Sequence, residues 1–112
     1  MYQIVCSMNN WHIVAPDVQI PLYETENNAT EILVRCVQEE NCTYEVYRDF
    51  NGDKKNFAMT ADGTGLHLPL SSGFLTDAGT YICQIKGTYT DGKVKISNQF
   101  TLSVGTFIGK SN

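Results

Sequence analysis

The clearest strand signal in the chain is Asp77-Ala78-Gly79-Thr80-Tyr81-Ile82-Cys83. From Gly79 onward, the residues Tyr81, Cys83 and Ile85 occupy alternate positions. Alternation with a period of two is the pattern of a β-strand that buries one face. We therefore predict a strand that begins near Gly79 and turns these three side chains into a core.

The residues after this strand predict a β-hairpin. Asp91 and Gly92 lie between Thr90 and Lys93, and an Asp-Gly pair suits the positive φ angles of a type I′ turn. The run that follows is long and has apolar residues at even positions, interrupted only by Asn98. It predicts one continuous apolar face, formed by Val94, Ile96, Phe100, Leu102 and Val104.

The residues before Asp77 predict further short strands. The charge of Glu45 indicates that Tyr44 and Val46 face the core while Tyr47 faces outward. About seven antiparallel strands between Gly, Asn, Asp and Ser turns predict an all-β sandwich. The other predicted strands are an edge strand from Val18 to Leu22, a strand over 30–37 with Ile32, Val34 and Cys36 on one face, a strand at Phe57-Ala58-Met59 after the Asn51-Gly52-Asp53 turn, and a strand with Leu66, Leu68 and Leu70 on one face.

Length and charge limit the domain organisation and the partners. The chain has 112 residues, enough for one domain over residues 1–105 and a C-terminal tail or linker over 106–112. Its net charge is −4. A nucleic-acid binder needs a basic face that releases counterions from phosphate, so we expect no nucleic-acid partner.

Four cysteines and two glycosylation sequons indicate the compartment. An even cysteine count in a short chain predicts disulfides and an oxidising environment. Zinc is the alternative, but Cys6, Cys36, Cys42 and Cys83 include no Cys-x-x-Cys pair, so we expect no metal. The sequons at Asn28 and Asn41 favour a secreted or cell-surface glycoprotein.

The chain shows no leader peptide and no membrane-spanning run. We therefore expect an excised extracellular segment, attached to a membrane only through parts of the parent chain that are absent.

The motif Asp77-x-Gly79-x-Tyr81-x-Cys83 resembles the strand F signature of the immunoglobulin superfamily. The resemblance implies a tyrosine corner, in which Asp77 and Gly79 precede Tyr81 and its hydroxyl bonds back onto the backbone. It also implies the disulfide Cys36–Cys83 between the sheets, and with it Cys6–Cys42 at one end of the sandwich. Two free thiols are the alternative to the second pair.

The resemblance extends from Val18 to Val104 but lacks one hallmark. The inward Trp of strand C is missing, because the single Trp is Trp11, so Tyr44 or Val46 would fill that space. The spacing between Cys36 and Cys83 is short for a variable-type domain and fits a C2-set or I-set domain better. The final hairpin also resembles that of interleukin-1-receptor-type ectodomain modules.

Catalytic and cofactor motifs are not found in the sequence. His12 and His67 could pair on paper with Ser71, Ser72 or Asp77, but no nucleophile motif surrounds them. Alternation predicts that His67 lies on the outer face as a solvated side chain. The Asp49, Asn51 and Asp53 series lacks the later ligands of a calcium loop. We therefore predict a non-enzymatic protein without a cofactor.

Aromatic residues beyond those needed for a core point to protein binding, since exposed aromatics anchor interfaces. We predict a partner surface at Tyr47 and at the tip of the last hairpin, formed by Thr88, Tyr89, Thr90 and Asp91. The protein would be a receptor, adhesion or immune module, host or viral, that binds a protein ligand or receptor. Two alternatives are a spacer in a longer receptor chain and an intracellular structural domain of the muscle type.

Overall fold

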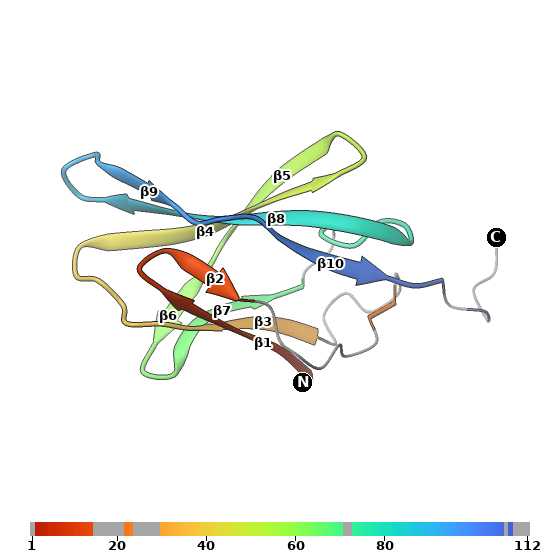
Figure 1. Ribbon diagram of the computed structural model, residues 1–112, viewed down its shortest axis with the longest axis horizontal. Coiled ribbons are helices and arrows are strands. Elements are labelled where there is room, and N and C mark those ends of the chain that lie inside the picture. The colour runs from red at the N-terminus through yellow and green to blue at the C-terminus, as the bar shows by residue number, and fades with distance from the viewer. Residues whose placement is uncertain (1, 15–21, 24–29, 71–72, 107, 109–112) are drawn as a thin grey trace.

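The computed structural model describes residues 2–14, 22–23, 30–70, 73–106 and 108, and it is all-β, as predicted (Figure 1). The described residues contain no helix and form ten strands in two sheets. The strands are β1 (Tyr2–Asn9), β2 (His12–Val14), β3 (Thr30–Arg35), β4 (Cys42–Phe50), β5 (Asp53–Ala58), β6 (Thr60–Asp62), β7 (Gly65–Pro69), β8 (Gly79–Tyr89), β9 (Val94–Ile96) and β10 (Phe100–Val104).

The two sheets form two layers, which Figure 1 shows one above the other. One sheet has the order β2-β1-β3-β7-β6, and the other has the order β10-β8-β4-β5 with β9 also paired to β8. Most neighbouring strands are antiparallel, but β1 runs parallel to β3. The prediction of about seven antiparallel strands was therefore wrong in number and in this pairing.

The first hairpin is the main element that the sequence did not predict. Asn9 pairs with His12, and the two residues between them, Asn10 and Trp11, have φ values of 50° and 63°. Two positive φ angles in a two-residue loop are the requirement of a type I′ turn. Asn10 suits the first of these positions, but Trp is unusual at the second, so the sequence lacks the Asn-Gly or Asp-Gly pair that typically marks such a hairpin.

The core lies between the sheets and is built from the predicted inward faces. Tyr81, Cys83 and Ile85 of β8 are buried, and so are Ile32, Val34, Tyr44, Val46, Leu66, Leu68 and Leu70. These predictions are confirmed. Trp11 stacks on Tyr44 with ring centroids 5.8 Å apart, so aromatic volume enters this part of the core from the first hairpin.

The last strand is split, which overturns the prediction of one continuous apolar face. Phe100, Leu102 and Val104 are buried, whereas Val94 and Ile96 are 44% and 55% exposed. Ile96 pairs with Lys86, but Phe100 pairs with Cys83, so β9–β10 carries one more residue than β8 across Ser97-Asn98-Gln99. Such a β-bulge moves every later side chain to the opposite face.

The turn of the last hairpin also differs from the type I′ turn that the sequence predicted. Gly92 N donates to Tyr89 O, Tyr89 N donates to Lys93 O, and Gly92 alone has a positive φ, 89°. This is a three-residue loop with a type I turn and a left-handed glycine. The Asn51-Gly52 loop, with φ values of 51° and 86°, has the type I′ geometry instead.

Some sequence-based predictions lie outside the described residues. They include the edge strand from Val18 to Leu22 except for the buried Leu22, the sequon residue Asn28, Ser71 and Ser72, and most of the tail over 106–112.

Candidate functional site

The outer face of the β4–β8–β9 sheet carries four exposed apolar side chains, which we call the outer patch. Tyr47 is 41% exposed and Ile82 is 39% exposed, and Val94 and Ile96 complete the set. The strand register brings them together, because Tyr47 pairs with Gln84 beside Ile82, and Ile96 pairs with Lys86. They line a groove of about 470 Å³.

Polar contacts hold Tyr47 in place in the lining of this groove. Its hydroxyl donates to Glu45 at 3.2 Å, and Asn56 of β5 donates to the other oxygen of the same carboxylate at 2.9 Å. The ammonium of Lys86 lies 5.6 Å from the centroid of the Tyr47 ring. These contacts within the chain fix the orientation of the aromatic side chain.

The bulge is fixed by its own side chains. Ser97 is buried and accepts two hydrogen bonds from β8, from Ile85 N to Ser97 Oγ at 2.9 Å and from Gln84 Nε2 to Ser97 O at 2.8 Å. Asn98 accepts from Ile13 N at 2.6 Å and donates to Ile13 O at 3.1 Å. These bonds tie the bulge to both sheets, and the polar Ser97-Asn98 pair was the sequence signal that could have revealed it.

The predicted binding residues do not all share one surface. Tyr47 faces outward as predicted, and Thr88 lies on the same side of the sheet, opposite Thr43. Tyr89 lies on the other side of β8 and donates its hydroxyl to Glu39. Thr90 and Asp91 form the turn, where Asp91 Oδ1 accepts from Lys93 N at 3.0 Å. The structure therefore does not bring Tyr47 and Tyr89 together.

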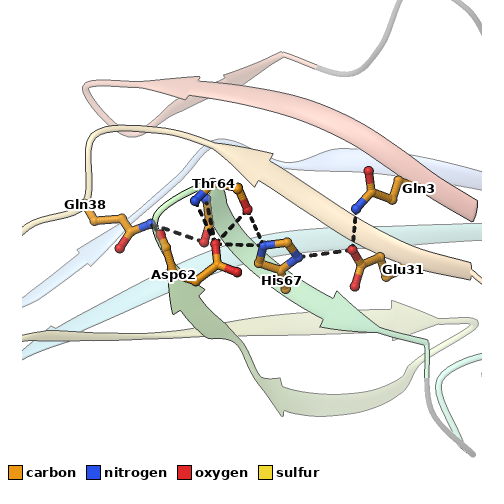
Figure 2. Close-up of polar contacts among 7 residues, drawn as sticks. Gln3, Glu31, Gln38, Asp62, Thr64 and His67 are labelled. Atoms are coloured by element: carbon orange, nitrogen blue, oxygen red, sulfur yellow. Dashed lines mark hydrogen bonds and ion pairs between the residues drawn. The ribbon is translucent and has the colours of Figure 1, made fainter. Parts of the chain in front are cut away.

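A polar cluster occupies the outer face of the other sheet, and we call it the His67 cluster (Figure 2). His67 Nδ1 lies 3.1 Å from Glu31 Oε1, and Nε2 lies 3.0 Å from Asp62 Oδ1 and 2.7 Å from Thr64 Oγ1. Gln3 donates to Glu31 at 2.6 Å. The prediction of an ordinary solvated histidine was therefore wrong, since the His67 side chain is only 18% exposed.

The two carboxylates shape the titration of the cluster. The hydrogen bond to Glu31, followed by that to Asp62, raises the pKa of His67 above its ordinary value. Hydrogen bonds from the Thr64 hydroxyl and backbone, and then from His67, lower the pKa of Asp62 to about 2. Partial burial opposes the hydrogen bonds from Gln3 and His67, but these bonds still lower the pKa of Glu31.

The His67 cluster has the sequence of contacts found in hydrolase triads, hydroxyl to imidazole to carboxylate. Catalysis requires a neutral imidazole that takes the hydroxyl proton. Here the Thr64 hydroxyl donates to Asp62 Oδ1 at 2.6 Å, and the two carboxylates favour the imidazolium form of His67. The arrangement suits a charge network that joins β3, β6 and β7 better than a nucleophile.

The tyrosine-corner residues lie at the start of β8. The Tyr81 hydroxyl accepts from Thr76 N at 2.9 Å and from Asp77 N at 3.0 Å, and it donates to Asp77 O. Gly79 has a φ of 145°, and a Cβ atom there would lie 2.8 Å from the Phe50 ring. The bonds between the Tyr81 hydroxyl and the backbone of Asp77 are the contact that the resemblance implies.

Arg48 is a buried cation that the sequence analysis did not single out. It is 1% exposed and donates to Asp53 O at 2.8 Å and to Gly73 O at 2.5 Å. Its guanidinium also lies 5.6 Å from the centroid of the Tyr81 ring. Within the described part of the chain, its Nε has no hydrogen-bond partner.

The four cysteines are all described, and the structure holds them as free thiols. The predicted pairs Cys36–Cys83 and Cys6–Cys42 are therefore not confirmed. Cys6 and Cys83 are buried in the core, where burial raises their pKa values to about 11 and about 12. Cys36 and Cys42 are half-buried. Asn41 of the second sequon is exposed in a turn, with a φ of 58°.

The described residues hold neither a metal-binding cluster nor a membrane-spanning helix. These residues include no group of three or more His, Cys, Asp or Glu side chains that could hold a metal ion. They also include no helix with the length and apolar character needed to cross a membrane. No protein-family model matches the chain, and no curated protein matches it either.

Proposed function

We propose that this protein is an immunoglobulin-like binding module of a secreted or cell-surface glycoprotein, and that its outer patch binds another protein. The observation that carries the proposal is the exposure of Tyr47, Ile82, Val94 and Ile96 on one sheet face. Scattered apolar residues on a surface need no explanation, whereas a contiguous group marks an interaction site.

The composition of this face supports a protein partner. Protein interfaces combine an aromatic or aliphatic centre with a polar rim. Here the rim carries both signs of charge, with Lys54 and Lys86 near Glu45 and Asp49. Such a mixed rim favours a protein surface with an apolar centre over a uniformly charged polymer.

The remaining features support the family and the compartment. Two facing sheets and the Tyr81 hydroxyl bonded to the backbone of Thr76 and Asp77 fit an immunoglobulin-like domain. An exposed sequon at Asn41 and four cysteines in a short chain fit an extracellular location. The proposed function is non-enzymatic and needs no cofactor.

The test is capture of partners from cell-surface and secreted proteomes with three forms of the chain. The test variant is Val94→Glu with Ile96→Glu, which places two charges in the outer patch. The control is Val37→Glu, at a position that is 92% exposed and outside the patch. We expect a specific partner to bind the wild type and Val37→Glu equally and to be lost with the double variant.

Two results would contradict the proposal. Equal binding of one partner to all three forms would move the interface away from the outer patch. The absence of any specific partner, with all three forms folded, would favour the alternative of a spacer domain.

A further inference from the structure

We propose that, on oxidation, the cysteines pair as Cys6–Cys83 and Cys36–Cys42, and not as the immunoglobulin resemblance implies. This inference rests on where the fold places the four side chains, and it does not depend on the proposed function.

Cys6 and Cys83 are the two cysteines in the centre of the core, and they enter it from opposite sheets. Cys6 lies on β1 opposite Val34, and Cys83 lies on β8 opposite Arg48. They are 2% and 0% exposed. Burial is the main cause of the high pKa of Cys83, and the charge of Arg48 lowers this pKa. The Cys6 side chain is near enough to raise the pKa of Cys83 further.

Cys36 and Cys42 lie together at one end of the core, around Tyr44. Cys36 follows the last residue of β3 and lines a cavity with Met8, Trp11 and Tyr44. The Cys42 sulfur lies 2.9 Å from the point where a Cβ of Gly87 would stand, and Gly87 pairs with Tyr44. Both cysteines contribute to the raised pKa of Tyr44, after the larger effect of burial.

The strand register separates these two locations. On β8, Gly87 lies four residues beyond Cys83, which is about 13 Å along an extended strand. A disulfide requires Cα atoms within about 7 Å of each other. Cys42, whose sulfur lies near Gly87, is therefore poorly placed to reach Cys83 or its neighbour Cys6, so the implied pair Cys6–Cys42 would have to span this separation. Cys36 lies two residues beyond Val34, the register partner of Cys6, and shares the cavity at Tyr44 with the end of the core where Cys42 lies.

The oxidation can be balanced with a small-molecule disulfide such as oxidised glutathione as oxidant. For each protein disulfide, two cysteine thiols give up two protons and two electrons, and one S–S bond forms between them. The S–S bond of the oxidant breaks, and its two sulfur atoms take up the two electrons and the two protons, which yields two glutathione thiols. Because Cys6 and Cys83 are buried in the folded protein, this exchange should occur before the sheets close.

Tryptic mapping separates the three possible pairings. The chain has Arg35 between Cys6 and Cys36, and Arg48 between Cys42 and Cys83, but no Lys or Arg between Cys36 and Cys42. The unglycosylated chain is reduced, refolded in a glutathione redox buffer, alkylated and digested without reductant. We expect peptide 36–48 alone, lighter by two hydrogens, and peptide 1–35 linked to peptide 56–86.

The other outcomes overturn the proposal. Each of the two other pairings joins all three peptides into a single product. Four alkylated cysteines would show that no disulfide forms. As a control for folding, the Cys36→Ser, Cys42→Ser variant should retain the link between peptides 1–35 and 56–86. The Cys6→Ser, Cys83→Ser variant should retain the closed loop within peptide 36–48, and loss of either link in these variants contradicts the pairing.

Discussion

The two outer sheet faces of this protein both follow period-two alternation, but they carry different kinds of side chain. On the β3–β7–β6 face, His67, Glu31 and Asp62 bind one another, so the polar side chains are satisfied within the chain. On the β4–β8–β9 face, Val94 and Ile96 stand exposed beside Tyr47. A face whose polar groups are already hydrogen-bonded within the chain needs no partner, whereas covering an exposed apolar face with a partner is favourable in free energy.

The outward placement of Val94 and Ile96 arises from one inserted residue. Without the bulge at Ser97-Asn98-Gln99, Val94 and Ile96 would face the same side as Phe100. The bulge therefore removes two apolar side chains from the core and places them on the surface. Bulges are retained features of strands and often redirect side chains toward functional sites. The following predictions test this contrast between the two faces.

The largest expected effect is on partner binding at Tyr47. We expect Tyr47→Ala to weaken binding by about 2 kcal/mol, roughly 30-fold, because the ring is a pre-oriented aromatic anchor. Titration calorimetry with the captured partner measures this change. Tyr89→Ala is the matched control, since Tyr89 faces the other side of β8 and bonds to Glu39. A larger loss for Tyr89→Ala would place the interface at the hairpin tip.

The second effect is on stability and concerns the residue that fixes the bulge. Asn98→Ala removes both side-chain bonds to the backbone of Ile13. We expect a loss of about 1–2 kcal/mol in the free energy of unfolding, because the two backbone groups lose their partners. Denaturant titration measures it, with the exposed neighbour Gln99→Ala as control. Equal midpoints for both variants would mean that these bonds do not stabilise the bulge.

The third effect depends on pH and concerns the other face. The pKa of His67 is raised above 6.5, so its contribution to stability is complete below that pH and is lost as the pH rises through the higher folded value. The pKa of Glu31 is lowered from 4.5, so its contribution is present above that pH and is lost on acidification. The His67 cluster therefore stabilises the fold most between about pH 4.5 and 6.5.

The His67→Asn variant tests this pH window. We expect the difference in unfolding free energy between wild type and variant to be largest inside the window and to shrink above and below it. Denaturant titrations at several pH values measure the difference. The exposed His12 of β2 supplies the control variant His12→Asn. A difference that stays constant from acid to alkaline pH would exclude the ionic role of His67.

The sequence predicted the buried faces better than the surfaces. Period-two alternation identified the inward side chains of β3, β4, β7 and β8, because burial acts on each strand separately. It failed at Ile96, because the apolar residues on both sides of the bulge have the same parity, and only the polar Ser97-Asn98 pair between them marks the extra residue. It failed for the His67 cluster, since Glu31 and His67 lie 36 positions apart and meet only through the pairing of β3 with β7.

The cysteines also show that local sequence patterns do not predict long-range strand pairing. Alternation predicted a strand over 30–37 with Cys36 on its inward face, whereas the structure ends β3 at Arg35 and leaves Cys36 half-buried. The first strand that the sequence predicted runs from Val18 to Leu22, whereas the structure has an earlier strand, β1, that contains Cys6. The position of β1 depends on its parallel pairing with β3, a long-range contact that local sequence does not encode.

The smallest expected effect is at Ile96, and it gives the sharpest comparison with the alternation pattern. Ile96→Thr keeps a β-branched side chain at a position that is 55% exposed, so we expect the free energy of unfolding to change by no more than about 0.5 kcal/mol. Leu102→Thr is the comparison, because Leu102 has the same parity but is 7% exposed. There we expect a loss of about 2 kcal/mol or more, from the cavity and the buried hydroxyl. Similar losses at both positions, measured by denaturant titration, would mean that Val94 and Ile96 belong to the core and that the outer patch does not exist.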